Sequence, residues 1–350
     1  MDKRIVESYI NILKEELEPA TGCTEPIAIA YCAAKMKEVL GANPDKIKII
    51  VSRNILKNAM GVVIPPTKNL RGVKESAILG ILGGNPEKKL QVLDTVNDTH
   101  LKKTQELINT DYAVLEVENN HKLYIEITGY KNNDYARVII KDTHTNIVRI
   151  EKNREIISEI TADFDNAADL KENRSLLNIH DIYKFSSKVE IDKITPIIKN
   201  QIDCNYAIAK EGLKNEYGLN VGKTILAHAQ AGDIIKKAQS YTAAASDARM
   251  SGVNLPVITN SGSGNQGITT SVPLVIYAES KGLAEDKLYR ALTLSNLISI
   301  HIKTKIGKLS AFCGAVSAAT GVAGGISFLD GADITQIENT IKNVLANISG

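Results

Sequence analysis

The spacing of the apolar residues changes once along the chain, and this change limits the folds that the chain can adopt. Between residues 46 and 152 the apolar residues form short β-branched runs such as IKIIVS, GVVIP, YAVLEVE and ARVIIKD, separated by Asn, Asp, Gly and His. Runs of this kind predict strands. After about residue 162 the apolar residues recur at helical spacing, and no ladder of strands returns. The pattern predicts an α+β fold, with a predominantly helical domain and an inserted mixed α/β region of short strands.

The first 45 residues are also expected to be helical. Apolar positions recur at helical spacing in residues 3–17, and a second helix is predicted from Pro26 to about Leu40. We therefore predict that residues 1–45 and 162–350 form one helical domain, which carries the chemistry. Residues 46–161 are then the α+β region, with one helix expected inside it at about residues 73–82.

Composition excludes several classes of partner. The chain has 350 residues with 42 basic and 40 acidic side chains, so its net charge of +2 offers no electrostatic footprint for nucleic acid or an anionic membrane. A small molecule is the expected partner. The first residues lack the apolar core of a secretory signal, which predicts a cytoplasmic protein. The uncharged runs 255–278 and 311–329 are too rich in small and polar residues for membrane insertion, and we interpret them as buried segments.

The four cysteines are scattered and form no CxxC pair. They do not predict a disulfide framework, so in a reducing cytosol each serves packing, catalysis or metal binding. Cys32 lies within an apolar helical pattern and Cys204 lies in a similar one. Both are predicted to be core residues.

Cys23 and Cys313 share a more unusual environment. Pro26 favours the first turn of a helix, so Cys23 is expected near unsatisfied backbone N–H groups and the positive end of the helix dipole. Ser310 is a natural N-cap, which would make Cys313 the third residue of another helix. Two readings stay open: small buried residues at close helix contacts, or thiolates that act as nucleophiles or as ligands of a soft metal centre. Two helix N-termini would suit an iron–sulfur cluster, which carries negative charge.

A glycine-rich stretch, NSGSGNQGI, follows a short apolar run at residues 254–259. Gly262, Gly264 and Gly267 satisfy G-x-G-x-x-G, but no βαβ unit is predicted around them, which argues against a dinucleotide site. Its backbone N–H groups and polar side chains suit a carboxylate as well as a phosphate. A glycine-rich turn without a ligand stays the alternative. The residues that we expect to contact a substrate here are Ser261, Gly262, Ser263, Gly264, Asn265 and Gln266.

Two other polar stretches are less specific. Residues 52–66 place Arg53, Asn54, Lys57 and Asn58 between apolar neighbours, and judged alone they predict a solvated helix face. The stretch SDARMSG at residues 246–252 predicts a helix C-terminus with a local ion pair between its Asp and Arg.

Taken together, five stretches of the chain resemble one known family. They are PATGCTEPIA, SRNILKNAMGVVIP, SDARMSG, SGSGNQGI and LSAFCGAVSAATGVAGG. They look like the signatures of the L-cysteine desulfidases, also known as the serine dehydratase alpha-chain-like proteins of the UPF0597 group. The resemblance spans residues 3–350 in the same order.

The resemblance implies an oxygen-sensitive [4Fe-4S] enzyme that converts L-cysteine to pyruvate, ammonia and hydrogen sulfide without pyridoxal phosphate. Related iron–sulfur L-serine dehydratases carry out the same β-elimination on L-serine, which is the alternative activity. In the family three cysteines hold the cluster, and one iron stays open to substrate. Cys23 and Cys313 match two of these ligands. The third belongs to a motif that follows NVLANISG, so it is expected beyond Gly350, and we expect the chain to be truncated before it.

Within this reading, the substrate carboxylate is assigned to the loop at residues 261–267, with Arg53, Asn54 or Asn58. The general base is not identified. His301, Lys303 and Lys305 are candidates only because they lie near Cys313 in the chain.

Rival functions make different demands on the same residues. A metal-free protein that binds a nucleotide or another small molecule would use the Gly262–Gly267 loop and would not need Cys23. A regulatory or scaffold protein would have neither a cluster nor an elimination activity. The sequence leaves the oligomeric state open, with a homodimer as one expectation.

Overall fold

The computed structural model describes residues 2–65, 67, 69–160, 174–306 and 314–347. The chain divides into two compact units. Residues 1–19, 164–248 and 255–350 form the helical unit, whereas residues 20–163 and 249–254 form the sheet unit. The predicted boundary at residue 45 differs from this division, since the second helix belongs to the sheet unit.

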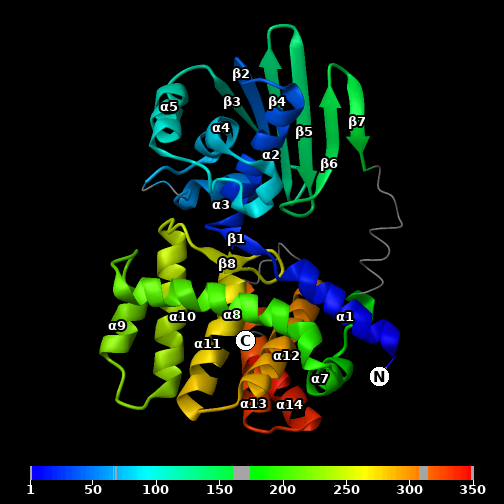
Figure 1. Ribbon diagram of the computed structural model, residues 1–350, viewed down its shortest axis with the longest axis vertical. Coiled ribbons are helices and arrows are strands. Elements are labelled where there is room, and N and C mark those ends of the chain that lie inside the picture. The colour runs from blue at the N-terminus through cyan, green and yellow to red at the C-terminus, as the bar shows by residue number, and fades with distance from the viewer. Residues whose placement is uncertain (1, 66, 68, 161–173, 307–313, 348–350) are drawn as a thin grey trace. The chain divides into compact units, whose positions relative to one another are not determined.

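The sheet unit is built on a six-stranded mixed sheet with the strand order β3-β2-β4-β5-β6-β7 (Figure 1). β2 is parallel to β3, and all the other neighbouring strands are antiparallel. With the helices, this sheet confirms the predicted α+β class. The strands are β2 (Lys46–Ser52), β3 (Ala113–Glu118), β4 (Tyr124–Lys131), β5 (Asp134–Lys141), β6 (Ile147–Lys152) and β7 (Glu155–Glu159).

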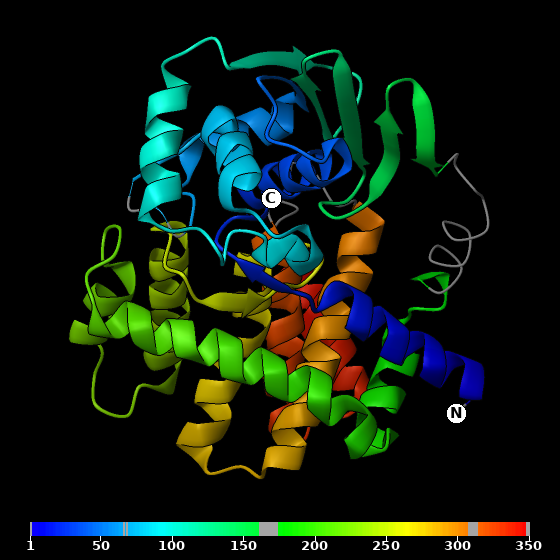
Figure 2. The ribbon, with the colours of Figure 1, turned by 45° about the horizontal axis from the view of Figure 1, so that its top comes forward.

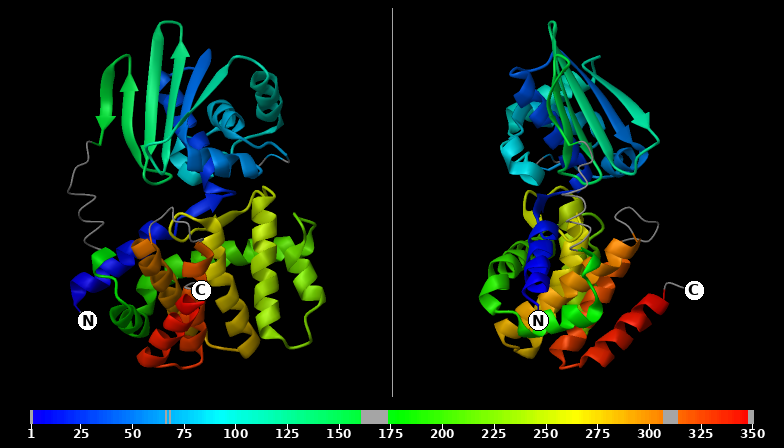
Figure 3. Two further views of the ribbon diagram at one scale, coloured as in Figure 1. Left: turned by 180° about the vertical axis from the view of Figure 1, so that it is seen from behind. Right: turned by 90° about the vertical axis from the view of Figure 1, so that its right-hand side faces the viewer.

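The helices of this unit lie on one face of the sheet (Figure 3). They are α2 (Thr24–Leu40), α3 (Arg53–Gly61), α4 (Val73–Gly83) and α5 (Asp98–Ile108), with β1 (Pro19–Thr21) before them and the 3-10 helix η1 (Pro86–Gln91) after α4. α2 packs between the sheet and α4, so residues 26–34 are all buried. A Cβ on Gly80 would lie 2.2 Å from the carbonyl oxygen of Ala30, which shows how closely α4 crosses α2. The helical pattern identified α2 but could not tell which partner buries it.

The strand pairing puts one set of apolar side chains against α2. Ile49 of β2 pairs with Ile127 of β4, and Ile127 pairs with Val138 of β5. All three are fully buried. Because side chains alternate between the two faces of a strand, this register sends every second residue of these strands into the core.

The opposite face of the sheet carries a charged network around Glu151. Its carboxylate accepts hydrogen bonds from Tyr135, Arg137 and Arg149, and the Arg149 Nη2 distance is 2.9 Å. The Tyr135 hydroxyl and the two guanidinium groups lower the pKa of Glu151 to about 2. Burial acts in the opposite direction and is outweighed. A carboxylate with several charge-assisted donors stabilises the fold only while it is ionised.

Replacing Glu151 by glutamine is expected to lower the free energy of unfolding by about 2 kcal/mol at pH 7, because two charge-assisted hydrogen bonds are weakened. The folded-state pKa lies below the ordinary value of 4.5, so this stabilisation is present above pH 4.5 and is lost as the pH falls towards 2. Urea unfolding of both proteins at pH 7 and pH 3 measures it. The difference should at least halve at pH 3, and an unchanged difference would contradict the assignment.

In the part of the helical unit that the structure describes, the elements are α-helices and the short strand β8 (Figure 2). α11, α12 and α13 pack against one another in its interior. Within the described residues, no helix is long and apolar enough to cross a membrane. Its elements are α1 (Lys3–Glu16), α7 (Ile179–Lys188), α8 (Ile191–Lys214), α9 (Val221–Ala227), α10 (Ile234–Met250), β8 (Pro256–Ile258), α11 (Gly264–Lys281), α12 (Glu285–Ile306), α13 (Gly314–Leu329) and α14 (Ile334–Ala346).

Several predicted segments need correction. The run GVVIP at residues 61–65 is not a strand, because it follows the end of α3 and then turns. α5 and β7 were not predicted. The sequence of β7, EIISE, does not alternate apolar and polar residues, so no period-2 pattern marks the strand, and all five of its residues are exposed.

Candidate functional site

Cys23 lies at the start of α2, as the sequence predicted. The helix begins at Thr24, two residues before the predicted start, and Cys23 is its N-cap. The preceding Gly22 has a φ of +67°, and a Cβ added there would lie 2.1 Å from Cγ of Pro65. Only glycine fits this turn, so Gly22 fixes how the chain enters the helix. The free N–H groups of the first turn and the helix dipole favour negative charge at Cys23.

Glu25 links Cys23 to side chains from two other elements of the sheet unit. Cys23 Sγ donates to Glu25 Oε2 at 2.9 Å, and Asn58 Nδ2, from α3, donates to Glu25 Oε1 at 2.9 Å. His144, in the turn between β5 and β6, places its Nε2 3.8 Å from the same Oε1. Together with Arg249, these four residues are called the Cys23 cluster below.

Arg249 joins this cluster from the short segment 249–254, at the end of α10. Its side chain is 3% exposed. Burial lowers the pKa of the guanidinium, while the neighbouring Cys23 and Glu25 act in the opposite direction. Since an arginine side chain keeps its charge in proteins, the cluster contains a buried positive charge beside Cys23.

The surroundings set the protonation states of Cys23 and Glu25. Burial first, and then the charge of Glu25, raise the pKa of the Cys23 thiol to about 12. Burial alone would raise the pKa of Glu25, but His144, Cys23 and Asn58 outweigh it and hold the pKa of this carboxyl well below its usual range. At pH 7 the pair is therefore a thiol that donates to a carboxylate. Only the thiolate binds a soft metal, so binding of a metal at Cys23 must release the thiol proton.

The donor set can be compared with what an iron–sulfur cluster needs. Such clusters are held by cysteine thiolates, and their negative charge suits positive surroundings. Cys23 supplies one thiolate, and the N-terminus of α2 and Arg249 supply positive charge. No group of three or more His, Cys, Asp or Glu side chains among the described residues could hold a metal ion by itself. Cys313 lies outside the described residues. Cys23 therefore fits the role of one cluster ligand.

The remaining cysteines pack as predicted. Cys32 is fully buried on α2, where its sulfur contacts the carbonyl oxygens of Ile125 and Val138. Cys204 is half-buried on α8 and packs against the helical core. Burial raises the pKa of both thiols. Neither residue belongs to the Cys23 cluster.

The glycine-rich stretch forms a tight turn that leads into α11. Asn260 and Ser263 exchange backbone hydrogen bonds of 3.1 Å, and between them Ser261 and Gly262 have φ values of +52° and +77°. Ser263 then caps the helix through Gln266 N. The preceding strand β8 is not part of the six-stranded sheet, so the motif lacks the parallel sheet of a dinucleotide fold.

Gly267→Ala is expected to destabilise the helical unit by about 2 kcal/mol or more, because the new Cβ would overpack the helix against the strand before it. That Cβ would lie 1.9 Å from the backbone oxygen of Ile258. Thermal unfolding measures the loss. Gly61→Ala, where nothing lies within 4 Å of the new Cβ, is the control and should change stability little. Equal stability of both variants would contradict the close packing.

The other predicted site residues are dispersed. Of the three candidates on α3, only Asn58 belongs to the Cys23 cluster. Arg53 is exposed, and Asn54 is exposed and donates to the carbonyl oxygen of Lys122. All three base candidates lie near the end of α12: Lys303 is buried, Lys305 is exposed, and His301 is half-buried with its Nδ1 unpaired among the described residues.

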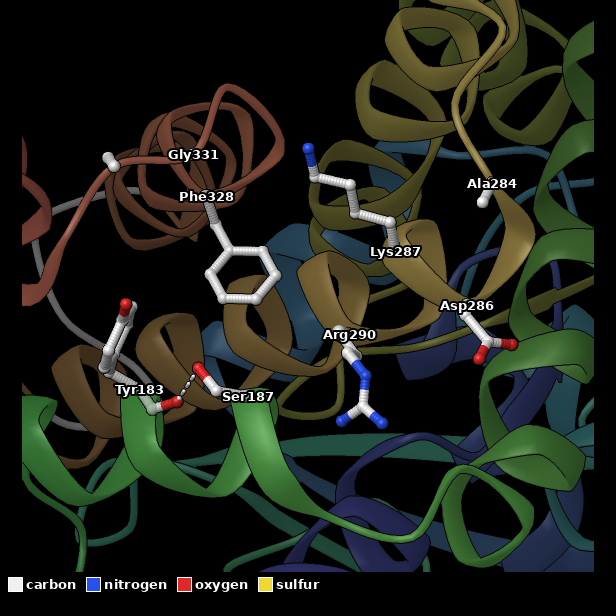
Figure 4. A pocket seen from close by; sticks show the side chains of 9 residues that line it. Tyr183, Ser187, Ala284, Asp286, Lys287, Arg290, Phe328 and Gly331 are labelled. Carbon is white, nitrogen blue, oxygen red and sulfur yellow. Dashed lines mark hydrogen bonds between the residues drawn. The ribbon is translucent and has the colours of Figure 1, made fainter.

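The helical unit also has an open pocket of about 420 Å³ that none of the predicted residues lines (Figure 4). Tyr183 and Phe328 stand edge to face at one side of it, with Lys287 and Asp286 at the other. Arg290 projects between them, and its Nη1 donates to the carbonyl oxygens of Ser186 and Val189 at the end of α7. These bonds explain Arg290 as a cap of that helix.

Sequence reasoning missed three residues of the Cys23 cluster. Glu25 stands in the same motif as Cys23, and its spacing of two residues was the available signal. His144 and Arg249 lie 121 and 226 positions beyond Cys23. No local sequence pattern predicts that residues so far apart in the chain lie close together in the fold.

The chain is similar to one protein-family model and to several curated proteins. The family model "Serine dehydratase alpha chain" matches residues 87–350. A UPF0597 protein of Treponema denticola is 44% identical over 100% of this chain and 82% of its own length. A UPF0597 protein of Lachnoclostridium phytofermentans is 46% identical over 98% of this chain and 82% of its own length. A third UPF0597 protein, of Desulfitobacterium hafniense, is 44% identical over 99% of this chain and 80% of its own length. The chain therefore belongs to the UPF0597 family, whose members carry a domain like the serine dehydratase alpha chain.

Proposed function

We propose that the protein is an iron–sulfur-dependent lyase that converts L-cysteine to pyruvate, ammonia and hydrogen sulfide. The observation that carries the proposal is the position of Cys23: a cysteine at a helix N-terminus, beside a buried arginine, in a chain whose family model is a dehydratase. Dehydration of serine and desulfuration of cysteine are the same β-elimination, with oxygen or sulfur as the leaving atom.

The cofactor in this proposal is a [4Fe-4S] cluster, and no pyridoxal phosphate is required. Cys23 and Cys313 would hold it. When bound, the cluster supplies an iron that acts as a Lewis acid and makes the leaving sulfur or oxygen less basic.

The chain's own residues supply the rest of the chemistry. Glu25 positions the thiol of Cys23 through a hydrogen bond, the thiol proton would be released to solvent when the metal binds, and Arg249 offsets the negative charge that forms there. The turn at Ser261–Ser263 and the first turn of α11 bind the substrate carboxylate, since backbone N–H groups at a helix start favour an anion. A base removes the proton from Cα of the substrate, hydrogen sulfide leaves, and the resulting aminoacrylate is hydrolysed to pyruvate and ammonia.

His301 is the base candidate to test first. Burial, and then the positive charge of Lys305, lower the pKa of its imidazole. The imidazole is therefore neutral at pH 7, which is the form that can accept a proton. His301→Asn should lower kcat by at least about 100-fold while KM changes little. An unchanged kcat would exclude His301 and leave Lys303 and Lys305.

L-serine dehydration is the second candidate function, because the matching family model is that of a serine dehydratase. Both substrates have the same head group, so only the leaving atom, sulfur or oxygen, distinguishes them. The test is release of pyruvate from L-cysteine and from L-serine by anaerobically reconstituted protein, with sulfide measured in parallel. Faster release from L-cysteine supports the proposal, faster release from L-serine supports the second candidate, and release from neither would contradict both.

A further inference from the structure

A chain of buried amides runs through the helical unit and ends in an unpaired oxygen. It joins four side chains that are each at most 3% exposed, and all four are amides: Gln201 of α8, Asn296 of α12, Asn260 of the glycine-rich turn and Gln266 of α11. Asn296 and Gln201 exchange two hydrogen bonds, of 2.7 and 3.1 Å. Asn260 Nδ2 donates to Asn296 Oδ1 at 2.9 Å, and Gln266 Nε2 donates to Asn260 Oδ1 at 2.9 Å.

The orientation of every amide in this chain is fixed by a backbone carbonyl at one end. Asn296 Nδ2 donates to the carbonyl oxygen of Leu292 at 2.9 Å, so its Oδ1 must face Asn260. Asn260 then presents Nδ2 to Asn296 and Oδ1 to Gln266. Gln266 donates to Asn260 Oδ1 through Nε2, which also donates to Ser299 Oγ at 3.0 Å. The Oε1 of Gln266 is thereby turned away from the network.

This Oε1 is buried and has no hydrogen-bond partner among the described residues. It faces the first residue of α13, because a Cβ on Gly314 would lie 2.3 Å from it. Leaving a buried acceptor unpaired costs about 1–3 kcal/mol. A buried acceptor that the network holds in this state is available to a donor of a bound ligand.

We propose that Gln266 Oε1 accepts a hydrogen bond from the α-ammonium group of the amino acid substrate, and that it selects amino acids over the corresponding acids without an amino group. Gln266 is the third residue of α11, so it stands in the same helical turn that favours the carboxylate. An α-amino acid carries its carboxylate and ammonium on one carbon, so the two groups reach one turn together. The inference rests on the proposed function.

Two substitutions separate the acceptor from its donors. Gln266→Met and Gln266→Glu both remove the hydrogen bonds that Nε2 donates, but only glutamate keeps an acceptor at the Oε1 position. The midpoint temperature of thermal unfolding should therefore fall by a similar amount in both variants. The ligands are L-alanine and propionate, which differ in the ammonium group and have no leaving group, so binding is measured by calorimetry without turnover.

The wild-type protein and Gln266→Glu are expected to bind L-alanine more tightly than propionate. In Gln266→Met this preference should fall by about 10- to 100-fold, the value of a hydrogen bond to a charged group, with propionate binding unchanged. An equal loss for both ligands in Gln266→Met, or no preference in the wild-type protein, would overturn the inference. Sulfide release from L-cysteine by the wild-type protein is measured separately, and its absence would count against the proposed function alone.

Discussion

Cys23→Ala is expected to abolish sulfide and pyruvate release and to reduce bound iron to background, while the protein stays folded. A cluster that loses a thiolate ligand loses part of its binding free energy, and no other described cysteine lies beside Glu25 and Arg249 to replace it. Iron and sulfide content, the visible absorbance of the reconstituted protein and activity all report this loss. Cys313→Ala should behave in the same way.

Cys32→Ala is the matched control for this result. Cys32 stands on the same helix as Cys23 but is fully buried among apolar residues. Its replacement should cost about 1–2 kcal/mol of stability and leave the iron content unchanged. Activity that survives in Cys23→Ala, or iron that is lost equally from Cys32→Ala, would mean that Cys23 only packs the start of α2.

Glu25→Gln and Arg249→Met are expected to shift the titration of Cys23 in opposite directions. The carboxylate of Glu25 raises the pKa of the thiol and the guanidinium of Arg249 lowers it, on top of the larger effect of burial. In metal-free protein, Glu25→Gln should lower the pKa of Cys23 from about 12 towards the ordinary value of 9, and Arg249→Met should raise it. The shifts should be on the order of one pH unit. Site-resolved alkylation by iodoacetamide across the pH range measures both.

The same two variants should be less stable by about 3 kcal/mol, because each removes one partner from a buried charged group. The pKa of Glu25 is depressed in the folded protein, so its contribution is present above the ordinary value of 4.5 and is lost as the pH falls. Wild-type protein should therefore lose its advantage over Glu25→Gln below about pH 4. Shifts of the thiol pKa in the same direction for both variants would exclude the arrangement of charges around Cys23.

The sequence allowed the secondary structure around Cys23 to be predicted, but not its electrostatic surroundings. Pro26 and the apolar pattern after it placed Cys23 at a helix start, and it is the N-cap of α2. The sequence predicted a local ion pair between the Asp and the Arg of SDARMSG. In the structure Asp247 accepts a hydrogen bond from Gly222 N, and Arg249 belongs to the Cys23 cluster. Helical spacing predicts the helix that carries a charge, whereas the partner of that charge depends on tertiary packing.

In the glycine-rich turn, too, the secondary structure was predicted from the sequence but the partners of the side chains were not. Its residues were predicted to present polar groups to a ligand, and the turn does begin α11. The side chain of Gln266, however, uses its donors inside the protein, on Asn260 and Ser299. Asn296 and Gln201 were not predicted at all, because single amides within long helices have no local pattern. Gly267 was singled out because it completes the G-x-G-x-x-G pattern. In the structure a glycine is needed at this position because the carbonyl oxygen of Ile258 leaves no room for a Cβ.

The segment at residues 249–254 has a consequence for synthesis. The sheet unit takes its first stretch from residues 20–163 and its last six residues only after a long passage through the helical unit. On the ribosome, the strands and helices around Cys23 can therefore assemble well before Arg249 emerges. Until then Glu25 lacks this buried counter-charge, and Cys23 lacks the positive charge that lowers the pKa of its thiol. The order of translation would thus delay metal capture by Cys23 until most of the chain has been made.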